Sequence, residues 1–313
     1  MPTRRQFLTA AGAGLCSLPS LLRAQSSASA FRFAVIADSH VIDPFYVGPE
    51  GNPEDTETIF LTADRLAAAR DALNAVDPPV EQVFLVGDYF HDYPSDDVDF
   101  YFTHETRLDR AKALTDGFRA PVHVGFGNHD YAVPRVSREA SHELFRRKFG
   151  LAPYYAVDHR GFRFIHLNNF LGATWDAGHP DYNRSVGSLG EAQLLWLDAQ
   201  LAERRPTFIF IHFPLSVVQP VEVRDFGLHT LLRRHAGTVQ RVFSGHWHRW
   251  VDEGRTYGPP HLVIGATRYD PDAYLVVEAD PQTATHRLLN LDLVEWNTHF
   301  IKPYVSPRPA RGL

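Results

Sequence analysis

Cysteine is almost missing from this sequence of 313 residues, and the single one is Cys16. Cys16 lies within an N-terminal segment that has the features of a removable signal, so the mature protein is expected to hold neither a thiol nor a disulfide, even in an oxidising compartment. Attachment of a lipid to Cys16 is not favoured, since Leu15 stands where a lipoprotein signal needs a small residue. The fold must therefore be stabilised without disulfides.

A basic excess and long apolar stretches are also missing. Lysine and arginine total 31 against 37 aspartate and glutamate residues, which gives a formal net charge of −6. Non-specific binding to nucleic acid depends on a basic excess, so we expect no nucleic-acid duplex as a partner. Beyond the first 25 residues no apolar stretch is long enough to span a bilayer, so no stable membrane insertion is expected after the N-terminal segment is removed. Internal repeats are absent too, which favours a single domain.

The first 25 residues have the architecture of an export signal, with a basic start, a short apolar segment of small residues and a polar end. The run Thr3–Leu8 (TRRQFL) matches the twin-arginine export signal. We therefore predict a twin-arginine signal peptide over residues 1–30, the twin-arginine export machinery as a partner, and a periplasmic or secreted mature protein. Cleavage fits either Ala28–Ala30 or Ala24–Gln25, and an uncleaved N-terminal anchor helix is the alternative.

The rest of the chain alternates short apolar runs with longer amphipathic segments, which indicates a layered α/β domain over residues 31–302. Apolar runs rich in Val, Ile and Phe predict buried strands at Phe31–Ala37, Gln82–Val86, Pro121–Phe126, Phe162–Leu167, Thr207–Ile211 and Val239–Ser244. Apolar residues three and four apart predict helices at Thr56–Val76, Phe102–Gly117, Ser137–Phe149 and Leu189–Glu203. Later strand-like segments predict an all-β end to the domain, at Trp250–Glu253, His261–Gly265, Tyr274–Glu278 and His286–Leu291.

Outside these elements, two loops and the C-terminus stand out. The loops Asp43–Asp55 and Gly172–Ser188 are rich in Gly, Pro, Asp and aromatic residues, and either could cover a site at the ends of the strands. Residues 303–313 include three prolines and are predicted to form an irregular tail.

Side chains of the metal-ligand type directly follow nearly every predicted strand of the α/β part. The motifs are Asp38-Ser39-His40, Gly87-Asp88, Gly127-Asn128-His129-Asp130, a single His212, and Gly245-His246-Trp247-His248. Sites in open α/β sheets form outside the carboxyl ends of the strands, so these side chains are expected to meet. Residues two apart in an extended segment project to one side, which would let Asp38 and His40 bind one ion. The glycines that precede Asp88, Asn128 and His246 suit a sharp exit from a strand.

In this order, the motifs resemble those of the calcineurin-like metallophosphoesterases. The resemblance extends from about Phe31 to Val277, and Gly190–Leu197 is similar to that family's helix before the fourth motif. It implies an α/β fold with two packed β-sheets flanked by helices, in four layers (α/β/β/α). It also implies a dinuclear metal centre with Asp38, His40 and His248 on a first ion, Asn128, His212 and His246 on a second, and Asp88 as the bridge.

The ligand chemistry agrees with this resemblance. Carboxylate, imidazole and amide ligands without a thiolate suit two divalent or mixed-valence ions such as Mn, Fe or Zn. Two such ions outweigh the charge of the two carboxylates, so the site stays net positive and favours hydroxide and phosphate. In two-metal hydrolases the ions lie about 3.5–4 Å apart and clamp the attacking and leaving oxygens. Water held by the ion pair would become a metal-bound hydroxide, which acts as the nucleophile.

Two further residues are candidates for catalysis. By the resemblance, His129 is not a metal ligand and would contact the phosphate or protonate the leaving oxygen, although a turn-capping histidine is the alternative. The second motif departs from known branches of the family, because His91 stands where protein phosphatases have an aspartate and purple acid phosphatases a metal-binding tyrosine. Asp92, one position further along, is the candidate to orient His129 instead.

From these observations we expect a two-metal phosphoester hydrolase, namely a phosphodiesterase for a small nucleotide-like or other organic phosphate. The alternatives are a phosphomonoesterase, such as an acid phosphatase or nucleotidase, and a catalytically silent metal-binding protein of the same fold. Aromatic residues flank the ligand motifs and either stack on a ring of the substrate or pack in the core; they are Tyr89, Phe90, Trp247 and Trp250. His123 and His166 lie inside predicted strands and are expected to be core or supporting residues rather than ligands.

Overall fold

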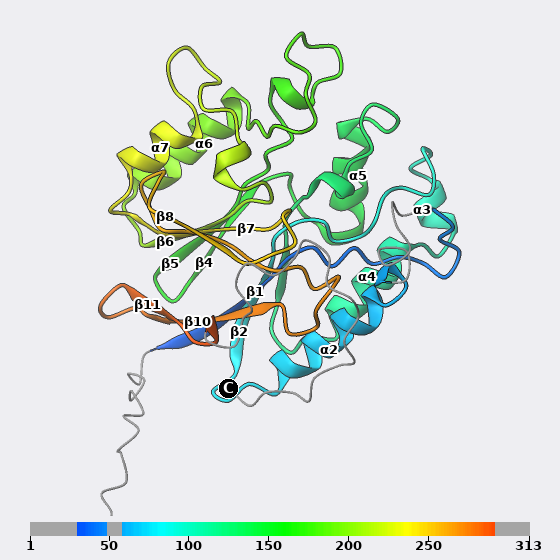
Figure 1. Cartoon of the computed structure of the whole chain (residues 1–313), viewed down its shortest axis with the longest axis horizontal. Helices are drawn as coiled ribbons and strands as arrows, with labels where there is room; N and C mark the ends of the chain where they lie inside the picture. The colour runs from blue at the N-terminus through cyan, green and yellow to red at the C-terminus, as the bar shows by residue number, and fades with distance from the viewer. Residues whose placement is uncertain (1–29, 49–57, 292–313) are drawn as a thin grey trace, which may run out of the picture.

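Two β-sheets lie against each other at the centre of the protein, and helices flank them (Figure 1). The computed structural model describes residues 30–48 and 58–291. The predicted signal peptide up to Ser29, the predicted tail and the second half of the loop Asp43–Asp55 lie outside the described residues. Among the described residues, none of the helices has the length and apolar character that crossing a membrane requires.

The first sheet has the strand order β11-β10-β1-β2-β3. Its strands are β1 (Phe31–Ile36), β2 (Val80–Leu85), β3 (Val122–Val124), β10 (Tyr274–Asp280) and β11 (Thr285–Leu288). The first three run parallel to one another, whereas β10 is antiparallel to both β1 and β11. The carboxyl ends of β1, β2 and β3 therefore meet at one edge of this sheet.

The second sheet has the strand order β4-β5-β6-β7-β9-β8. Its strands are β4 (Tyr155–His159), β5 (Phe162–His166), β6 (Thr207–Phe210), β7 (Val239–Ser244), β8 (Val251–Gly254) and β9 (His261–Val263). The four strands β5, β6, β7 and β9 are parallel, and antiparallel strands β4 and β8 form the two edges. This mixed sheet thus also presents several strand ends on one side.

The helices lie outside the two sheets. They are α2 (Thr62–Asn74), α3 (Phe100–Thr103), α4 (Arg107–Asp116), α5 (Arg138–Phe149), α6 (Glu191–Ala202) and α7 (Leu228–Arg234), and short 3₁₀ turns occur at Asn128–Asp130, Ala173–Trp175 and Leu215–Val217. In Figure 1, α2 and α4 lie beside the first sheet, and α6 and α7 lie beyond the second. Leu66 of α2 and Leu194 of α6 are fully buried. The predicted arrangement of two sheets between helices is confirmed.

Phenylalanine side chains fill the space between the sheets. Phe33 of β1 packs edge-on against Phe208 of β6 with 4.9 Å between the ring centroids, and Phe84 of β2 stacks on Phe210 at 4.4 Å. These four rings are completely buried. Burial of each such side chain contributes about 1.5–3 kcal/mol to stability, and offset or edge-on ring contacts add to this value. The strands that end at the ligand motifs are thereby fixed relative to one another.

Every strand and helix predicted from the sequence occurs in the structure, with bounds that differ by a few residues. Two predicted helices differ by more. In Thr56–Val76, residues 56 and 57 lie outside the described residues, and a turn at residues 60–61 precedes α2, which begins at Thr62. Phe102–Gly117, predicted as one helix, is divided into α3 and α4, because Thr106 caps the start of α4. Among the described residues, one strand and one helix were missed. The strand β4 lies at a sheet edge and is only partly buried, so it lacks a strong apolar run, and α7 has only 7 residues, too few for a clear helical period.

Candidate metal centre

The predicted ligands come together where the strand ends of both sheets face each other. Asp38 and His40 follow β1, Asp88 follows β2, and Asn128 begins the 3₁₀ turn after β3. The second sheet contributes the remaining ligands after β6 and β7, namely His212, His246 and His248. Ligand atoms within 4.8 Å of one another define one group of Asp38, His40, Asp88 and His248 and another of Asp88, His212 and His246. These groups correspond to the predicted first and second ion sites, and Asp88 belongs to both.

The backbone that carries the first two ligands is not extended, contrary to the sequence-based expectation. Asp38 and His40 have φ of 54° and 46°, in the left-handed region that side chains other than glycine seldom adopt. The amide of His40 still donates to the carbonyl of Asp88, at 2.9 Å, so the two ligand loops remain paired beyond the strands. Left-handed φ also occurs at Asp88, Asp92, His246 and His248. Strained backbone of this kind gathers at functional sites and persists only where the surrounding structure enforces it.

Two of the glycines before ligands are required for different reasons. Gly87 has φ of 75°, which agrees with the predicted sharp exit from a strand. Gly127 instead has an extended backbone, with φ of −114° and ψ of 179°, so the prediction of a sharp exit was wrong there. A Cβ atom on Gly127 would lie 2.2 Å from Oδ1 of Asp88. Gly127 is therefore needed because the third motif approaches the bridging carboxylate closely.

In the first group, the imidazoles of His40 and His248 and the carboxylates of Asp38 and Asp88 converge. Nε2 of His40 lies 3.2 Å from Nε2 of His248 and 3.3 Å from Oδ2 of Asp88. Nε2 of His248 lies 3.4 Å from Oδ1 of Asp38. Apart from His248, which is slightly exposed, these side chains are completely buried or nearly so.

In the second group, His212 is at the centre. Its Nε2 lies 3.2 Å from Oδ2 of Asp88 and 3.1 Å from Oδ1 of Asn128. Its Nδ1 lies 2.9 Å from the carbonyl of Val86, which can only accept, so Nδ1 carries a proton and Nε2 is the nitrogen left for an ion. The backbone thus fixes the tautomer of His212 that metal binding requires.

This donor set fits two metal ions. Ligand atoms about 2.0–2.2 Å from a borderline ion stand roughly 3 Å apart, and the separations between 3.1 and 3.4 Å observed here match that spacing. Oδ2 of Asp88 faces both His40 and His212, while its Oδ1 accepts a hydrogen bond of 2.8 Å from the amide of His129. If two ions bind, Oδ2 of Asp88 is therefore the carboxylate oxygen that would face both of them.

Burial and neighbouring charges shift the pKa values of several predicted ligands. Burial alone would raise the pKa of Asp88, but His212, His129 and His40 together hold it well below the usual value. Burial would lower the pKa of His212, but the nearby Asp88 and Asp38 raise it to about 9. Burial lowers the pKa of His246 to about 3. Asp88 is therefore a carboxylate, and His246 a neutral imidazole, near neutral pH.

The predicted catalytic pair is also brought together. Nδ1 of His129 lies 2.9 Å from Oδ1 of Asp92, and the side chains of both residues are partly exposed at the edge of the ligand cluster. Burial would lower the pKa of His129, but Asp88 and Asp92 outweigh it and raise the pKa. The structure thus places an imidazole with a raised pKa beside the ligand cluster, where the sequence predicted a group that contacts phosphate.

Sequence reasoning missed two residues that support the site. Asp130, the last residue of the third motif, is completely buried and accepts hydrogen bonds from the amides of Gly127, at 2.7 Å, and Tyr89, at 3.0 Å. It thereby connects the second and third motifs. Arg268 donates from its amide to the carbonyl of Asp38 at 2.9 Å, and its charge adds to the effect of burial in lowering the pKa of His40. The Gly-Asn-His-Asp motif contains Asp130, whereas no motif surrounds Arg268.

The aromatic residues beside the ligand motifs differ in their positions. Tyr89, Phe90 and Trp250 are buried, so these three pack in the core and do not face a substrate. Trp247 is only partly buried and lies under the guanidinium of Arg249, 5.4 Å from the ring centroid.

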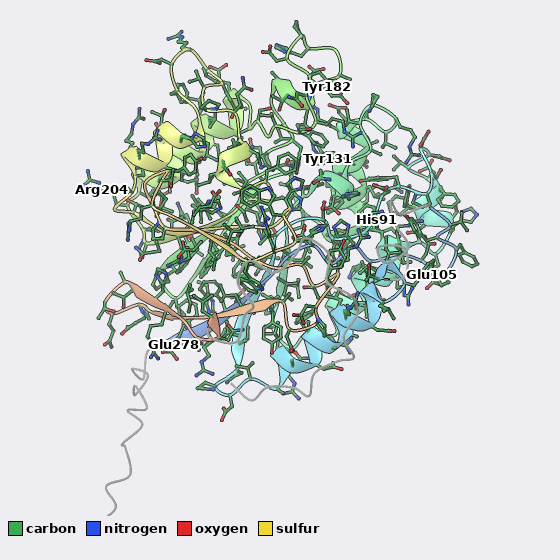
Figure 2. All side chains as sticks on the ribbon, viewed as in Figure 1. His91, Glu105, Tyr131, Tyr182, Arg204 and Glu278 are labelled. Carbon is green, nitrogen blue, oxygen red and sulfur yellow. The ribbon has the colours of Figure 1, made fainter. Side chains whose placement is uncertain are left out.

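The predicted supporting histidines and the second loop also have defined places. His123 and His166 lie near Phe84 in the core between the sheets, as expected. The loop Gly172–Ser188 folds on itself, with Trp175 Nε1 donating to the carbonyl of Val186 at 3.2 Å. Tyr182 of this loop and His91 beside the ligands lie well apart in Figure 2.

Comparison with known proteins agrees with this arrangement. The family model described as calcineurin-like phosphoesterase matches residues 31–250. A dimetal phosphatase from Danio rerio has a similar structure, with a TM-score of 0.55 and 20% sequence identity, over 79% of this chain and 92% of that one. Purple acid phosphatase PPD1 from yellow lupin gives a TM-score of 0.50 and 14% identity over 82% of this chain, which spans only 50% of the lupin protein. A comparison with curated protein sequences gives no match.

Proposed function

Because the chain belongs to the calcineurin-like phosphoesterases, which use a dinuclear metal centre, we propose that it hydrolyses a phosphodiester of a small nucleotide-like or other organic phosphate. The observation that supports hydrolysis is the position of the His129–Asp92 pair beside two complete ligand groups that share Asp88. All seven predicted ligands and His129 are present, which argues against a catalytically silent protein of the same fold.

The charge around the site supports a diester rather than a monoester. A phosphomonoester carries one more negative charge than a diester near neutral pH, and proteins commonly bind it through accessible arginine forks. Arg268 contributes positive charge near His40 and His129 but is only 3% exposed, so it offers little surface to a substrate. A singly charged diester fits this distribution better.

The roles of the residues follow from their geometry. Bound ions would be held by the two ligand groups and would supply Lewis acidity and an activated water. Nδ1 of His129 is taken by Asp92, so Nε2 is the nitrogen that faces the leaving oxygen of the ester and donates the proton. Asp92 keeps the ring in the orientation and the charge state that this donation requires.

The test is turnover of the purified mature protein on bis-p-nitrophenyl phosphate and on p-nitrophenyl phosphate, after chelation and with Mn, Fe, Zn or no metal added. We expect metal-dependent cleavage that favours the diester. A preference for the monoester would replace the proposal by a phosphatase or nucleotidase. His129→Ala should retain its metal ions and turn over more slowly than the parent, whereas a silent metal-binding protein would show no turnover in the parent.

A further inference from the structure

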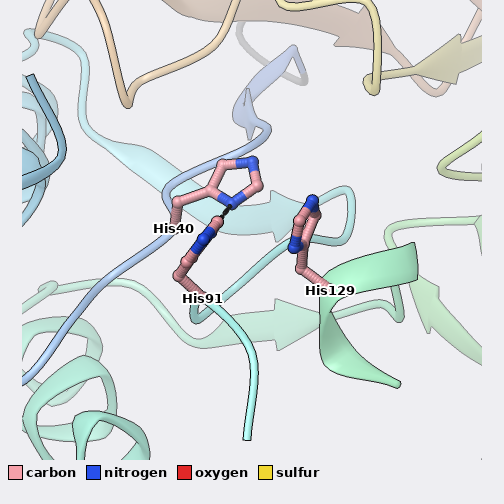
Figure 3. Close-up of side chains that lie close together, drawn as sticks. All are labelled: His40, His91 and His129. Carbon is pink, nitrogen blue, oxygen red and sulfur yellow. Dashed lines mark hydrogen bonds between the residues drawn. The ribbon is translucent and has the colours of Figure 1, made fainter. Parts of the chain in front are cut away.

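The ring of His91 lies next to that of the predicted metal ligand His40 (Figure 3). Nδ1 of His91 is 3.0 Å from Nδ1 of His40. On its other side, the ring of His91 stacks on that of His129, with 4.6 Å between the centroids and 21° between the planes. Nε2 of His91 is 3.8 Å from Oδ2 of Asp92. His91 therefore contacts a predicted ligand and both members of the predicted catalytic pair.

The position of His91 is itself held by several contacts. Its amide donates to the carbonyl of Val41 at 3.0 Å, and its carbonyl accepts from the guanidinium of Arg107. Arg107 is also bound to Asp43, with 2.8 Å between Nε and Oδ2. The ring of Tyr46 packs edge-on against the imidazole, 5.5 Å away, and His91 is only 4% exposed. Such an anchored ring can restrict the orientation of its neighbours.

Counting protons on the two rings assigns their tautomers. Nε2 of His40 faces Asp88 and His248, so its lone pair is the one available to an ion. A neutral imidazole carries a single N–H, so the proton of His40 must be on Nδ1 and is donated to Nδ1 of His91. The proton of His91 is then on Nε2, the nitrogen that faces Asp92.

We propose that His91 is a positioning residue, which fixes the tautomer and orientation of His40 for the first ion and connects this ligand to the Asp92–His129 pair. The partner of the non-ligating nitrogen of a metal-binding histidine is usually a carboxylate, a carbonyl or water. Here an imidazole has that place. The inference rests on the proposed function and deepens it.

The same assignment of protons argues against a third metal site formed by these rings and that of His129. Ring nitrogens of His40, His91 and His129 lie within 4.8 Å of one another and could by distance alone hold an ion. Binding through Nδ1 of His40 would require removal of the proton that remains there while Nε2 holds the first ion. The three rings therefore do not form a third metal site in the loaded enzyme.

The test measures metal affinity in His91→Phe, which retains a stacked ring but removes the acceptor for His40. We expect affinity at one of the two sites to fall by about 10- to 100-fold, with the other site unchanged, in chelator competition with Mn²⁺ or Zn²⁺. His91→Asn should restore part of the affinity, because its amide oxygen can accept from Nδ1–H. His123→Phe makes the same exchange away from the ligands and should bind both ions as the parent does.

Two outcomes would overturn the inference. The first is His91→Phe that folds, as judged by circular dichroism, and binds both ions within twofold of the parent. The second is a parent that binds more than two ions per chain and loses one of them in His91→Phe, which would make His91 a ligand. Since these measurements need no substrate, they remain decisive if neither p-nitrophenyl ester is cleaved and the proposed function fails.

Discussion

Asp92 binds His129 through a contact of 2.9 Å, although it lies one position beyond the place where the protein-phosphatase branch has its aspartate. Asp92 has φ of 55°, and this left-handed turn directs its carboxylate to His129. The site thus retains a carboxylate–imidazole pair, while His91 occupies the usual aspartate position and contacts His40 instead.

Asp92→Asn should lower turnover by about 10²-fold, because the ring of His129 loses the charge that favours its protonated form. The loss should be smaller for a p-nitrophenyl ester than for an alkyl ester, since p-nitrophenolate leaves without receiving a proton. Steady-state kinetics on both esters, together with metal counting, test this. Asp96→Asn, in the same loop but paired with Arg135 at the surface, is the matched control. An equal loss on both esters would argue against proton donation.

Gly127→Ala should reduce occupancy of both metal sites. The new methyl group would lie 2.2 Å from Oδ1 of Asp88, so the carboxylate shared by both ligand groups must move. Metal analysis after dialysis measures the effect. Gly237→Ala, where the added Cβ meets nothing within 4 Å, should leave metal content unchanged. Normal metal content in Gly127→Ala would show that the approach of the third motif to Asp88 is not critical.

Stability should fall in acid because of the buried histidines between the sheets. Burial lowers the pKa of His166 to about 3 and that of His123 to about 4, compared with roughly 6.5 in an unfolded chain. Between these pKa values the unfolded state binds protons that the folded state does not. The contribution of the two histidines to stability is therefore fully present above pH ~6.5, and it is lost as the pH falls toward their pKa values in the folded state. At pH ~5 the loss is about 2 kcal/mol for each histidine.

Urea unfolding at neutral pH and at pH ~5 checks this sign. His166→Phe should lose part of the acid sensitivity, by about 2 kcal/mol relative to the parent. His104→Phe, at an exposed position, should keep the sensitivity of the parent. The explanation would be wrong if the free energy of unfolding of His166→Phe declined with acid as steeply as that of the parent.

The export route remains a prediction that depends on Arg4 and Arg5. Replacing both by lysine should retain the precursor in the cytoplasm, because the twin-arginine machinery recognises the arginine pair. Cell fractionation followed by immunoblotting measures the distribution. Transfer of the double-lysine variant at the rate of the parent would indicate another route, and an unshortened protein in the membrane fraction would favour the anchor helix.

Much of the fold and site was predictable because buried parallel strands and their ends leave strong local patterns. Each ligand motif follows an apolar run, and the order of the motifs carries the metal assignment. What local patterns could not provide is direction. The left-handed backbone at Asp38 and His40 and the buried packing of Tyr89 depend on contacts between distant segments, and so does the contact of His91 with His40. The same holds for Arg268, which reaches the site from beyond the last motif.

The ligand cluster has a mechanical consequence, because its members come from both sheets. The first sheet contributes Asp38, His40, Asp88 and Asn128, and the second contributes His212, His246 and His248. Bound ions would act as a cross-link that resists separation of the two halves of the sandwich, and their binding free energy would add to the stability of the folded domain. If the ions bind before export by the predicted twin-arginine route, which carries folded proteins, they would also make the exported domain more rigid. Exposure to chelators would loosen the domain as a whole, well beyond the reaction centre.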